Sequence, residues 1–275
     1  MPNSTAGPWL EAVEGECVAS MGLAASSASG SSLGIEVRRW GRAVGIQTRR
    51  ADVLALNRVL GVGWPEPASP DQLAEMLAWF ETSGVSRCFF QVPPVAPQQE
   101  LREWLSRQGF AHYNNWVKLT RKLEDIPRAN GPTVKQLEPE HSPEFGRMVA
   151  AEFGWPRATA GWLGETFGAP GWRHYGAFNA NGSLLGVAVL QVIDRDAYFG
   201  FAATASEHRG QGVQTALLVQ RLREAREAGC ERVVVESAEE GPGRPAPSFR
   251  NLRRLGFEVA YLRANYLWKA QGSAA

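Results

Sequence analysis

The clearest hydrophobic pattern lies in the second half of the chain, where apolar runs alternate with a segment of helical periodicity. Between residues 211 and 228, apolar residues recur at three- and four-residue spacing, and Gly229 follows as a C-terminal cap, which predicts an amphipathic helix. Apolar runs predict strands at 133–137, 173–179, 185–192, 197–204 and 231–236, with the last strands in 257–268. Helices are predicted at 143–153, 157–167 and 247–255, and Asn181-Gly182 predicts a two-residue hairpin turn. An antiparallel meander followed by strand–helix–strand indicates a mixed α+β sheet.

The first half repeats parts of this pattern. Gly84-Val-Ser-Arg-Cys-Phe-Phe aligns with Gly229-Cys-Glu-Arg-Val-Val-Val at an offset of 145 residues, and two further short matches occur in order at nearly the same offset. We therefore predict two tandem α+β units, each a mostly antiparallel mixed sheet flanked by helices. The proline- and glycine-containing segment 123–132 predicts the boundary between domains at 1–125 and 131–270, and the Ser/Gly-rich segment 24–34 predicts a flexible loop.

Composition narrows the classes of function. The chain has 29 Lys and Arg against 28 Asp and Glu, a balance that gives no reason to expect nucleic acid or an anionic membrane as partner. It has no run of 18 apolar residues, so no membrane span is predicted. Three widely spaced cysteines form neither a metal-ligand pattern nor a disulfide framework, which predicts no metal and favours the reducing cytoplasm. Cys88 and Cys230 adjoin apolar runs and are predicted to be buried thiols.

The segment that carries chemistry begins where the strand at 197–204 ends. Arg209, Gly210 and Gly212 lie between that strand and the start of the long helix. The first N–H groups of a helix have no intrahelical acceptor, and with the helix dipole they form an anion site that side-chain-free glycines leave accessible. This arrangement predicts a pyrophosphate-sized ligand, the alternative being a glycine turn that only caps the helix. A dinucleotide-binding fold is disfavoured, because the glycines do not follow the first strand of a parallel unit.

These residues resemble a known family. Arg209-Gly-Gln-Gly212-Val-Gln214 is similar to the Arg/Gln-x-x-Gly-x-Gly/Ala signature of GNAT N-acetyltransferases and departs from it at Gln214. The segment from Ser248 to Gly256-Phe257 resembles the family's fourth helix, so the resemblance covers residues 133–269. It implies acetyl-CoA bound between two splayed strands. The residues that would contact the pantetheine arm by their backbone are Ala203, Thr204 and Ala205. The residues whose amides would hold the pyrophosphate are Arg209, Gly210, Gln211, Gly212, Val213, Gln214 and Thr215. Asn251 would contact the far side of the arm or its thiol end. Arg250 and Arg254 would form a basic rim, or only a solvated helix face.

The first half lacks this motif. At the equivalent offset it reads Trp64-Pro-Glu-Pro-Ala-Ser69, which has no glycine, has two positions without an N–H, and has a carboxylate that would repel phosphate. We therefore expect the first half not to bind coenzyme A. Pro70 begins a helix with Leu73, Leu77 and Phe80 on one face.

The resemblance implies direct attack of an amine on the thioester in a ternary complex. The tyrosine that often serves this family as general acid is replaced by Leu252, so Tyr261 and Tyr266 in the terminal strands are substitutes, with Tyr266 preferred; either could instead be an ordinary sheet tyrosine. Glu236, at the end of its strand, is the candidate base.

Other residues have side chains that could take part in this chemistry. Glu152 and Glu165 are candidates for binding a cationic substrate, or are solvated helix charges. His208 and His174 are predicted to be ordinary loop and strand residues, and Cys230 a core residue.

The sequence thus predicts a cytoplasmic N-acetyltransferase that uses acetyl-CoA as co-substrate and acts on a small-molecule or peptide amine. The alternative is a non-catalytic acyl-CoA-binding or regulatory module. Transfer of a longer acyl group and assembly as a homodimer are left open.

Overall fold

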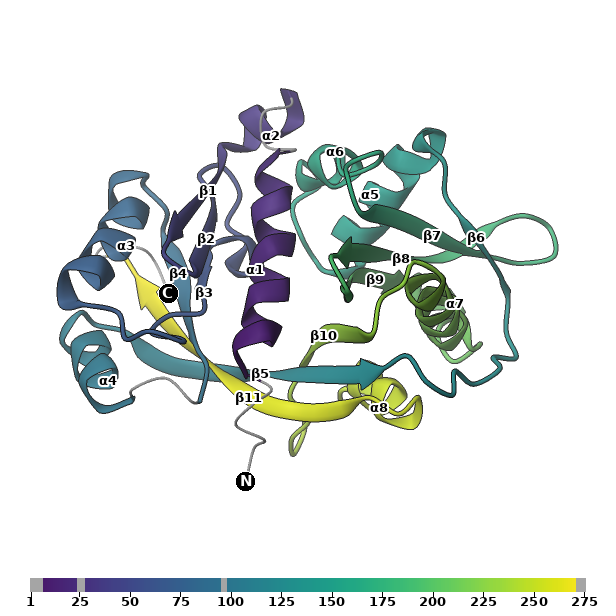
Figure 1. Ribbon diagram of the computed structural model, residues 1–275. Helices are drawn as coiled ribbons and strands as arrows, with labels where there is room; N and C mark the ends of the chain where they lie inside the picture. Colours follow the sequence, from purple (N-terminus) through teal and green to yellow (C-terminus); the bar gives the residue numbers. More distant parts are fainter. Residues whose placement is uncertain (1–6, 24–27, 95–97, 271–275) are drawn as a thin grey trace. The chain divides into compact units, whose positions relative to one another are not determined.

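Residues 7–23, 28–94 and 98–270 are described by a computed structural model, in which the chain forms two units (Figure 1). The first unit contains the chain up to Lys118 together with the segment from Val259 onward, and the second contains Leu119–Glu258. The boundary falls inside strand β5 (Ala111–Lys122). The last strand, β11 (Glu258–Lys269), pairs antiparallel with β4 (Arg87–Val92), so it belongs to the first unit. Residues 259–270, which the sequence pattern assigns to the second domain, therefore lie in the first unit.

The second unit is an antiparallel meander that ends in a parallel pair. Its strands lie in the order β10-β9-β8-β7-β6. Neighbours pair antiparallel from β6 to β9, and β9 and β10 pair in parallel. The strands are β6 (Thr133–Gln136), β7 (Trp172–Phe178), β8 (Leu184–Ile193), β9 (Asp196–Thr204) and β10 (Arg232–Ala238).

The helices of this unit bury one apolar stripe each. Helix α5 packs Phe145 against His174 of β7, with 4.9 Å between the rings, and α7 carries a buried row that includes Leu217, Leu218 and Leu222. The helices are α5 (Ser142–Glu152), α6 (Thr159–Gly164), α7 (Val213–Glu227) and α8 (Pro247–Arg254), with short 3-10 turns η3 (Pro139–His141) and η4 (Ser206–His208). These positions agree with the predicted strands and helices to within a few residues at each end.

The first unit repeats this order. Its strands lie in the order β1-β2-β3-β4-β11, antiparallel from β1 to β3 and parallel between β3 and β4. Helix α3 connects the parallel pair, as α7 does in the second unit, and buries the predicted Leu73, Leu77 and Phe80. The remaining elements are α1 (Gly7–Leu23), α2 (Ala28–Leu33), β1 (Ile35–Trp40), β2 (Ala43–Thr48), η2 (Leu54–Leu56), β3 (Arg58–Leu60), α3 (Pro70–Thr82) and α4 (Gln98–Arg107).

Two local predictions were wrong, and one helix is shorter than predicted. The predicted loop at 24–34 contains helix α2, while residues 24–27 lie outside the described residues. The predicted hairpin turn is a longer connection over 179–183, in which the side chain of Asn179 accepts hydrogen bonds from the N–H groups of Asn181 and Ser183. Helix α6 is shorter than predicted, because the chain turns through irregular structure on both sides of it.

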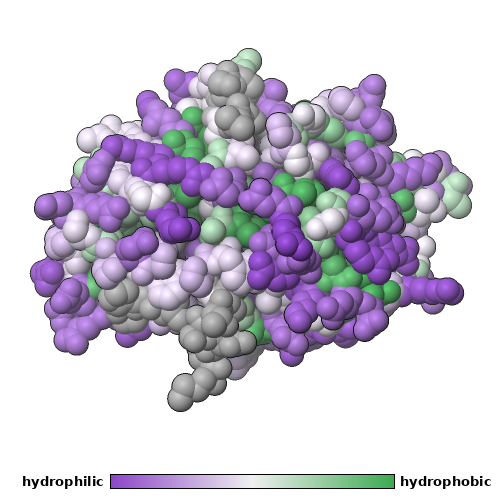
Figure 2. Space-filling view, in the orientation of Figure 1, coloured by the Kyte–Doolittle hydropathy of each residue, from purple (hydrophilic) through white to green (hydrophobic). Residues whose placement is uncertain are grey.

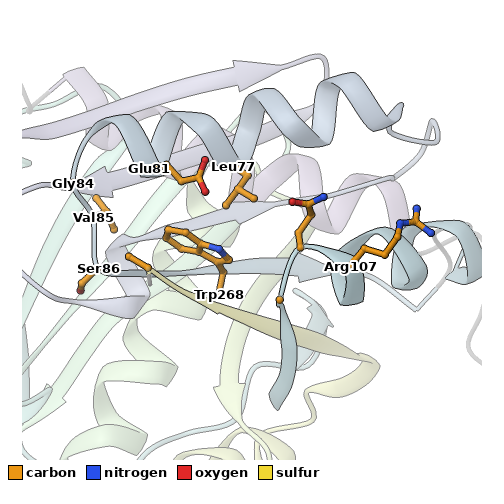
Figure 3. Close-up of a pocket in the computed structure, with 10 residues that line it drawn as sticks. Leu77, Glu81, Gly84, Val85, Ser86, Arg107 and Trp268 are labelled. Carbon is orange, nitrogen blue, oxygen red and sulfur yellow. The ribbon is translucent and has the colours of Figure 1, made fainter. Parts of the chain in front are cut away.

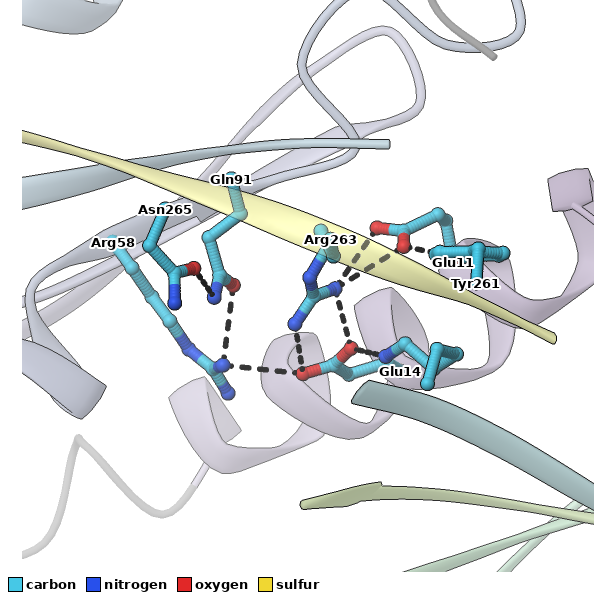
Figure 4. A network of polar contacts seen from close by, with 8 residues as sticks. Glu11, Glu14, Arg58, Gln91, Tyr261, Arg263 and Asn265 are labelled. Carbon is cyan, nitrogen blue, oxygen red and sulfur yellow. Dashed lines mark hydrogen bonds and ion pairs between the residues drawn. The ribbon is translucent and has the colours of Figure 1, made fainter. Parts of the chain in front are cut away.

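The core of the first unit contains a cluster of buried charges (Figure 4). Helix α1 contributes Glu11 and Glu14, whose carboxylates meet cationic side chains from three strands. These cations are Arg58 of β3, Lys118 of β5 and Arg263 of β11.

Glu14 is the centre of this cluster. Its side chain is fully buried; Arg263 Nη1 donates to it at 2.7 Å, Arg58 Nη1 lies at 3.2 Å, and Lys118 Nζ also contacts it. Burial raises the pKa of Glu14, but the attraction of Arg263, Lys118 and Arg58 outweighs it and holds that pKa well below its usual range. The first unit therefore depends on an ionised carboxylate inside its core.

The visible surface is mostly polar. Figure 2 shows hydrophilic residues over much of this face, with hydrophobic residues in patches between them. Among the described residues, no helix combines the length and the apolar character needed to cross a membrane.

Candidate functional site

The predicted anion loop connects β9 to α7 and has the geometry that its glycines allow. Gly210 has φ 79° and Gly212 has φ 78°, both in the left-handed region that side chains disfavour. A Cβ on Gly212 would also lie 3.2 Å from the carbonyl oxygen of Asn130, whereas a Cβ on Gly210 would meet nothing within 4 Å. The two glycines are therefore needed to turn the backbone into the helix.

The backbone N–H groups at this helix start precede the first intrahelical bond. Ala216 N–H donates to Gly212 O at 2.9 Å, so the N–H groups of Val213, Gln214 and Thr215 come before the intrahelical ladder. Arg209 N–H, in contrast, donates to Ser206 O at 3.4 Å. The donors that this loop can offer to an anion therefore concentrate on the helix side of Gly210.

A carboxylate from α5 fixes the other side of the loop. Glu152 accepts a hydrogen bond from Ser206 N–H at 3.1 Å and forms an ion pair with Arg209 at 2.6 Å. The Arg209 side chain remains 64% exposed, which leaves part of the guanidinium accessible. Glu152, which the sequence offered as a substrate-binding or solvated charge, is thus a partner of the loop.

Gln214, where the sequence departs from the family signature, has a structural role. Its amide donates to Ser248 Oγ at 2.7 Å and accepts from Asn251 Nδ2 at 2.6 Å. Arg254 in turn donates to Asn251 Oδ1 at 3.0 Å. The longer side chain therefore ties the start of α7 to α8 and engages Asn251, the predicted pantetheine contact. The only sign of this contact in the sequence is that Gln214 stands where the family signature has Gly or Ala.

Strands β9 and β10 separate beside this loop. Their parallel register runs from Asp196↔Arg232 to Phe199↔Val235 and ends there, although both strands continue. Glu236 is therefore the first residue of β10 beyond the paired segment. The stretch of β9 from Gly200 to Thr204 leads from this point to the glycine loop, so the split runs from Glu236 toward the predicted anion loop.

The backbone of β9 is irregular along the split. Its pairing with β8 has a bulge between Val187 and Val189. Phe201 lies opposite this bulge and adopts φ 43°, an uncommon value for a non-glycine residue. Ala205 N–H donates to Leu185 O at 3.0 Å. Since successive residues of a strand direct their N–H and C=O groups to opposite edges, Ala203 and Ala205 face β8 and Thr204 faces the split. Of the three predicted pantetheine contacts, Thr204 is the one so directed.

The candidate tyrosines belong to the first unit. Tyr261 is buried, and its hydroxyl donates to Glu11 at 2.5 Å as part of the charge cluster. Tyr266 is half-buried, lies opposite Phe90 of β4, and has its ring 5.9 Å from that of His112. The role of Tyr266 as general acid stays a prediction.

The histidine and cysteine interpretations are supported by burial. Burial lowers the pKa of His174 to about 3, so this ring is neutral; its Nε2 lies 2.8 Å from Thr166 Oγ1. Cys17, Cys88 and Cys230 are buried free thiols, and burial raises the pKa of each. A structural role therefore accounts for all four side chains.

A pocket of about 600 Å³ lies in the first unit, where α3, α4 and β11 end (Figure 3). Apolar side chains of Leu77 and Trp268 share its lining with the charged Glu81 and Arg107. None of the residues predicted to bind acetyl-CoA lines this pocket.

Comparison with known proteins identifies the family to which the second unit belongs. The family model described as "Acetyltransferase (GNAT) family" matches residues 135–257. Residues 135–257 form a GNAT domain. The match spans the glycine loop, strands β9 and β10, and α8. The GNAT fold supports acyl transfer in general. No curated protein matches the chain.

Solved structures of GNAT proteins share the fold of the whole chain. A GCN5-related N-acetyltransferase from Kribbella flavida is 17% identical, with a TM-score of 0.61, covering 92% of this chain and 97% of that one. A tandem GNAT protein from the clavulanic acid biosynthesis pathway is 19% identical, with a TM-score of 0.59, covering 96% of both chains. A GCN5-related N-acetyltransferase from Sphaerobacter thermophilus is 17% identical, with a TM-score of 0.60, covering 82% of this chain and 80% of that one. These similarities confirm the predicted architecture of two tandem GNAT-like units.

The anion site of the GNAT domain can be tested at Gly210. We expect Gly210→Asp to weaken acetyl-CoA binding at least about tenfold relative to Gly210→Asn, because a carboxylate at this open position would repel the pyrophosphate. Asn has nearly the same shape and tolerates the left-handed backbone equally well, so it controls for strain at φ 79°. Calorimetric titration of both variants measures the difference. Equal affinities would show that the loop only caps the helix.

Proposed function

We propose that this protein is an N-acetyltransferase that transfers the acetyl group of acetyl-CoA to an amine by direct attack within a ternary complex. The observation that carries this proposal is the glycine loop at the open end of the split between β9 and β10. The loop offers N–H groups to a pyrophosphate, and the split offers strand backbone to an extended arm. Acetyl-CoA has an anionic group and an extended arm in this order.

The order of groups along the split supports one position for the thioester. A pyrophosphate at the loop from Gly210 to Thr215 anchors one end of the cofactor. The arm then runs back along β9 past Thr204, whose backbone faces the split. The thioester reaches the region where β9 and β10 come together, at Phe199 and Val235. Glu236 follows directly after this point.

The proposed reaction uses Glu236 as general base. The carboxylate takes a proton from the ammonium, directly or through one water, and the free nitrogen lone pair attacks the carbonyl carbon of the thioester. The tetrahedral intermediate collapses with cleavage of the C–S bond, the nitrogen gives up its remaining excess proton to form the neutral amide, and the thiolate of coenzyme A leaves and is protonated. Tyr266, the sequence-based candidate for that proton donor, belongs to the first unit, so no residue of this site is assigned the step, and Tyr266→Phe tests the candidate. Cys230 takes no part, because the amine attacks the thioester without a covalent enzyme intermediate.

The proposal is tested by turnover and by stoichiometry. We expect calorimetry to give one acetyl-CoA site per chain, because the first unit has Trp64-Pro-Glu-Pro-Ala-Ser69 in place of the glycine loop. We expect release of free thiol from acetyl-CoA to depend on an added amine from a panel of primary amines. Two equivalent sites would contradict the assignment of the loop. Tight binding without thiol release across the panel would support a non-catalytic acyl-CoA-binding module instead, for which the replacement of the family tyrosine by Leu252 is the favouring observation.

A further inference from the structure

Four aromatic side chains gather where β9 and β10 separate: Phe153, Trp155, Trp172 and Phe201, here called the vertex aromatics. The ring centroids of Phe153 and Trp155 lie 5.2 Å apart, and those of Trp155 and Phe201 lie 6.3 Å apart. The rings of Trp172 and Phe201 lie 6.3 Å apart and are nearly parallel, at 22°. The rings therefore form one continuous row from the segment after α5, past β9, to β7.

This row is placed at the vertex of the split by the backbone. Phe201 lies two residues beyond Phe199, the last residue of β9 that pairs with β10. Its φ of 43° at the bulge departs from strand geometry and determines where its ring points. Backbone conformations of this kind concentrate at functional sites, because the surrounding structure must maintain them.

The row is not a closed core. Phe153 is 40% exposed, Trp155 and Phe201 are half-buried, and Trp172 is buried beneath them. Exposed aromatic area at the reacting end of a cofactor channel is a surface on which an apolar group can be buried.

We propose that the vertex aromatics bind the apolar part of the acceptor, so that the acceptor is an amine carrying an aromatic or bulky hydrocarbon group close to its nitrogen. This inference rests on the proposed function, which brings the thioester to the vertex. The attacking nitrogen must reach the thioester carbonyl beside Glu236, and the remainder of the acceptor then lies against the surface that borders the vertex. Aromatic rings stack on or pack edge-to-face with such a group, and their faces attract the ammonium before it loses its proton.

The neighbouring charges indicate which residue meets the nitrogen of the acceptor and which residues meet its hydrocarbon part. Glu152 directly precedes Phe153, but its carboxylate is bound to Ser206 N–H and Arg209. Glu236 lies at the split itself. The acceptor nitrogen is therefore served by Glu236, and its hydrocarbon part by the vertex aromatics.

The test compares 2-phenylethylamine with ethylamine in the full-length protein. We expect kcat/KM for 2-phenylethylamine to exceed that for ethylamine at least tenfold, and Trp155→Ala to remove most of this preference by raising KM for 2-phenylethylamine more than KM for ethylamine, with the Kd for acetyl-CoA unchanged. Tyr113→Ala, which removes an aromatic side chain that is 56% exposed in the first unit, is the matched control and should leave the preference intact.

The outcomes separate this inference from the proposed function. Amine-dependent thiol release without a preference for 2-phenylethylamine, or an equal loss for both amines in Trp155→Ala, overturns the inference and leaves the acetyltransferase proposal standing. Thiol release with another amine of the panel but with neither of these two also overturns the inference. If no amine of the panel causes thiol release, the proposed function fails, and calorimetric binding of 2-phenylethylamine then decides between the outcomes for the aromatic site. Binding that Trp155→Ala weakens at least tenfold supports the aromatic acceptor site, and no binding, or binding equal in both proteins, overturns it.

Discussion

Replacement of Glu14 by glutamine is expected to lower the free energy of unfolding by about 3–5 kcal/mol, the range typical for breaking a buried ion pair from one side. The Glu14 carboxylate is fully buried and contacts Arg58, Lys118 and Arg263. Glutamine keeps the shape and one acceptor oxygen but leaves these three cations in the core without that negative charge. The change in the free energy of unfolding is obtained from the midpoint and slope of urea unfolding, followed by circular dichroism.

The matched control is Glu16→Gln on the same helix. The Glu16 side chain is 52% exposed and pairs with Arg39 at 2.7 Å, so its loss should cost less than about 1 kcal/mol. Equal effects of the two substitutions would show that the buried cluster contributes no more than a surface pair.

The same carboxylate gives the cluster a pH dependence. The pKa of Glu14 is lowered in the folded protein below its ordinary value of 4.5, so the folded state holds the proton less tightly than the unfolded chain. Its contribution to stability is therefore complete above pH 4.5 and is lost as the pH falls below 4.5 toward the folded pKa. We expect the stability difference between the wild type and Glu14→Gln to shrink over that range. A difference that stays constant with pH would contradict the assignment of an ionised Glu14.

Glu236→Gln is expected to lower kcat at least about tenfold, while acetyl-CoA affinity stays nearly intact. Loss of a general base typically lowers the rate ~10²–10⁴-fold. Glu236 follows the last paired residue of β10, where the proposed thioester lies, and it is separated from the glycine loop by the length of the split. Glutamine keeps the shape but cannot take the proton. Steady-state kinetics with 2-phenylethylamine or the best amine of the panel, and calorimetry with acetyl-CoA, measure the two quantities.

The control for Glu236→Gln is Glu231→Gln. Glu231 immediately precedes β10 at its opposite end, where it pairs with Arg195, and its replacement should leave kcat unchanged. Raising the pH should restore part of the rate of Glu236→Gln, because a deprotonated amine needs no base. A change confined to the KM of the amine would instead identify Glu236 as a substrate-binding charge.

Much of the second unit could be predicted because its signals are local. The period of the apolar residues in 211–228 predicted α7, and the glycines at 210 and 212 predicted the turn before it, since left-handed φ values are a property of single residues. That the different segment Trp64–Ser69 keeps coenzyme A from the first unit stays a prediction.

The contacts that complete the site could not be predicted in this way. Glu152 lies 57 residues from Arg209, and Gln214 lies 37 residues from Asn251. The vertex aromatics come from the segment that follows α5 and from β7 and β9. An isolated carboxylate or tryptophan has the same local pattern on a solvated face as in a site, so its partner is known only when strand register and helix packing are known.

The strongest example is the end of the chain. The pattern of residues 258–269 predicts a strand but not the sheet that it joins, and β11 pairs with β4 of the first unit. Through that pairing Arg263 reaches Glu14, 249 residues earlier in the sequence. The amino-acid order thus specified the elements and the anion loop through periodicity and single-residue backbone preferences. Which strands pair, and which charges and rings meet, was set by long-range packing, since burial in a shared core is what makes those contacts favourable.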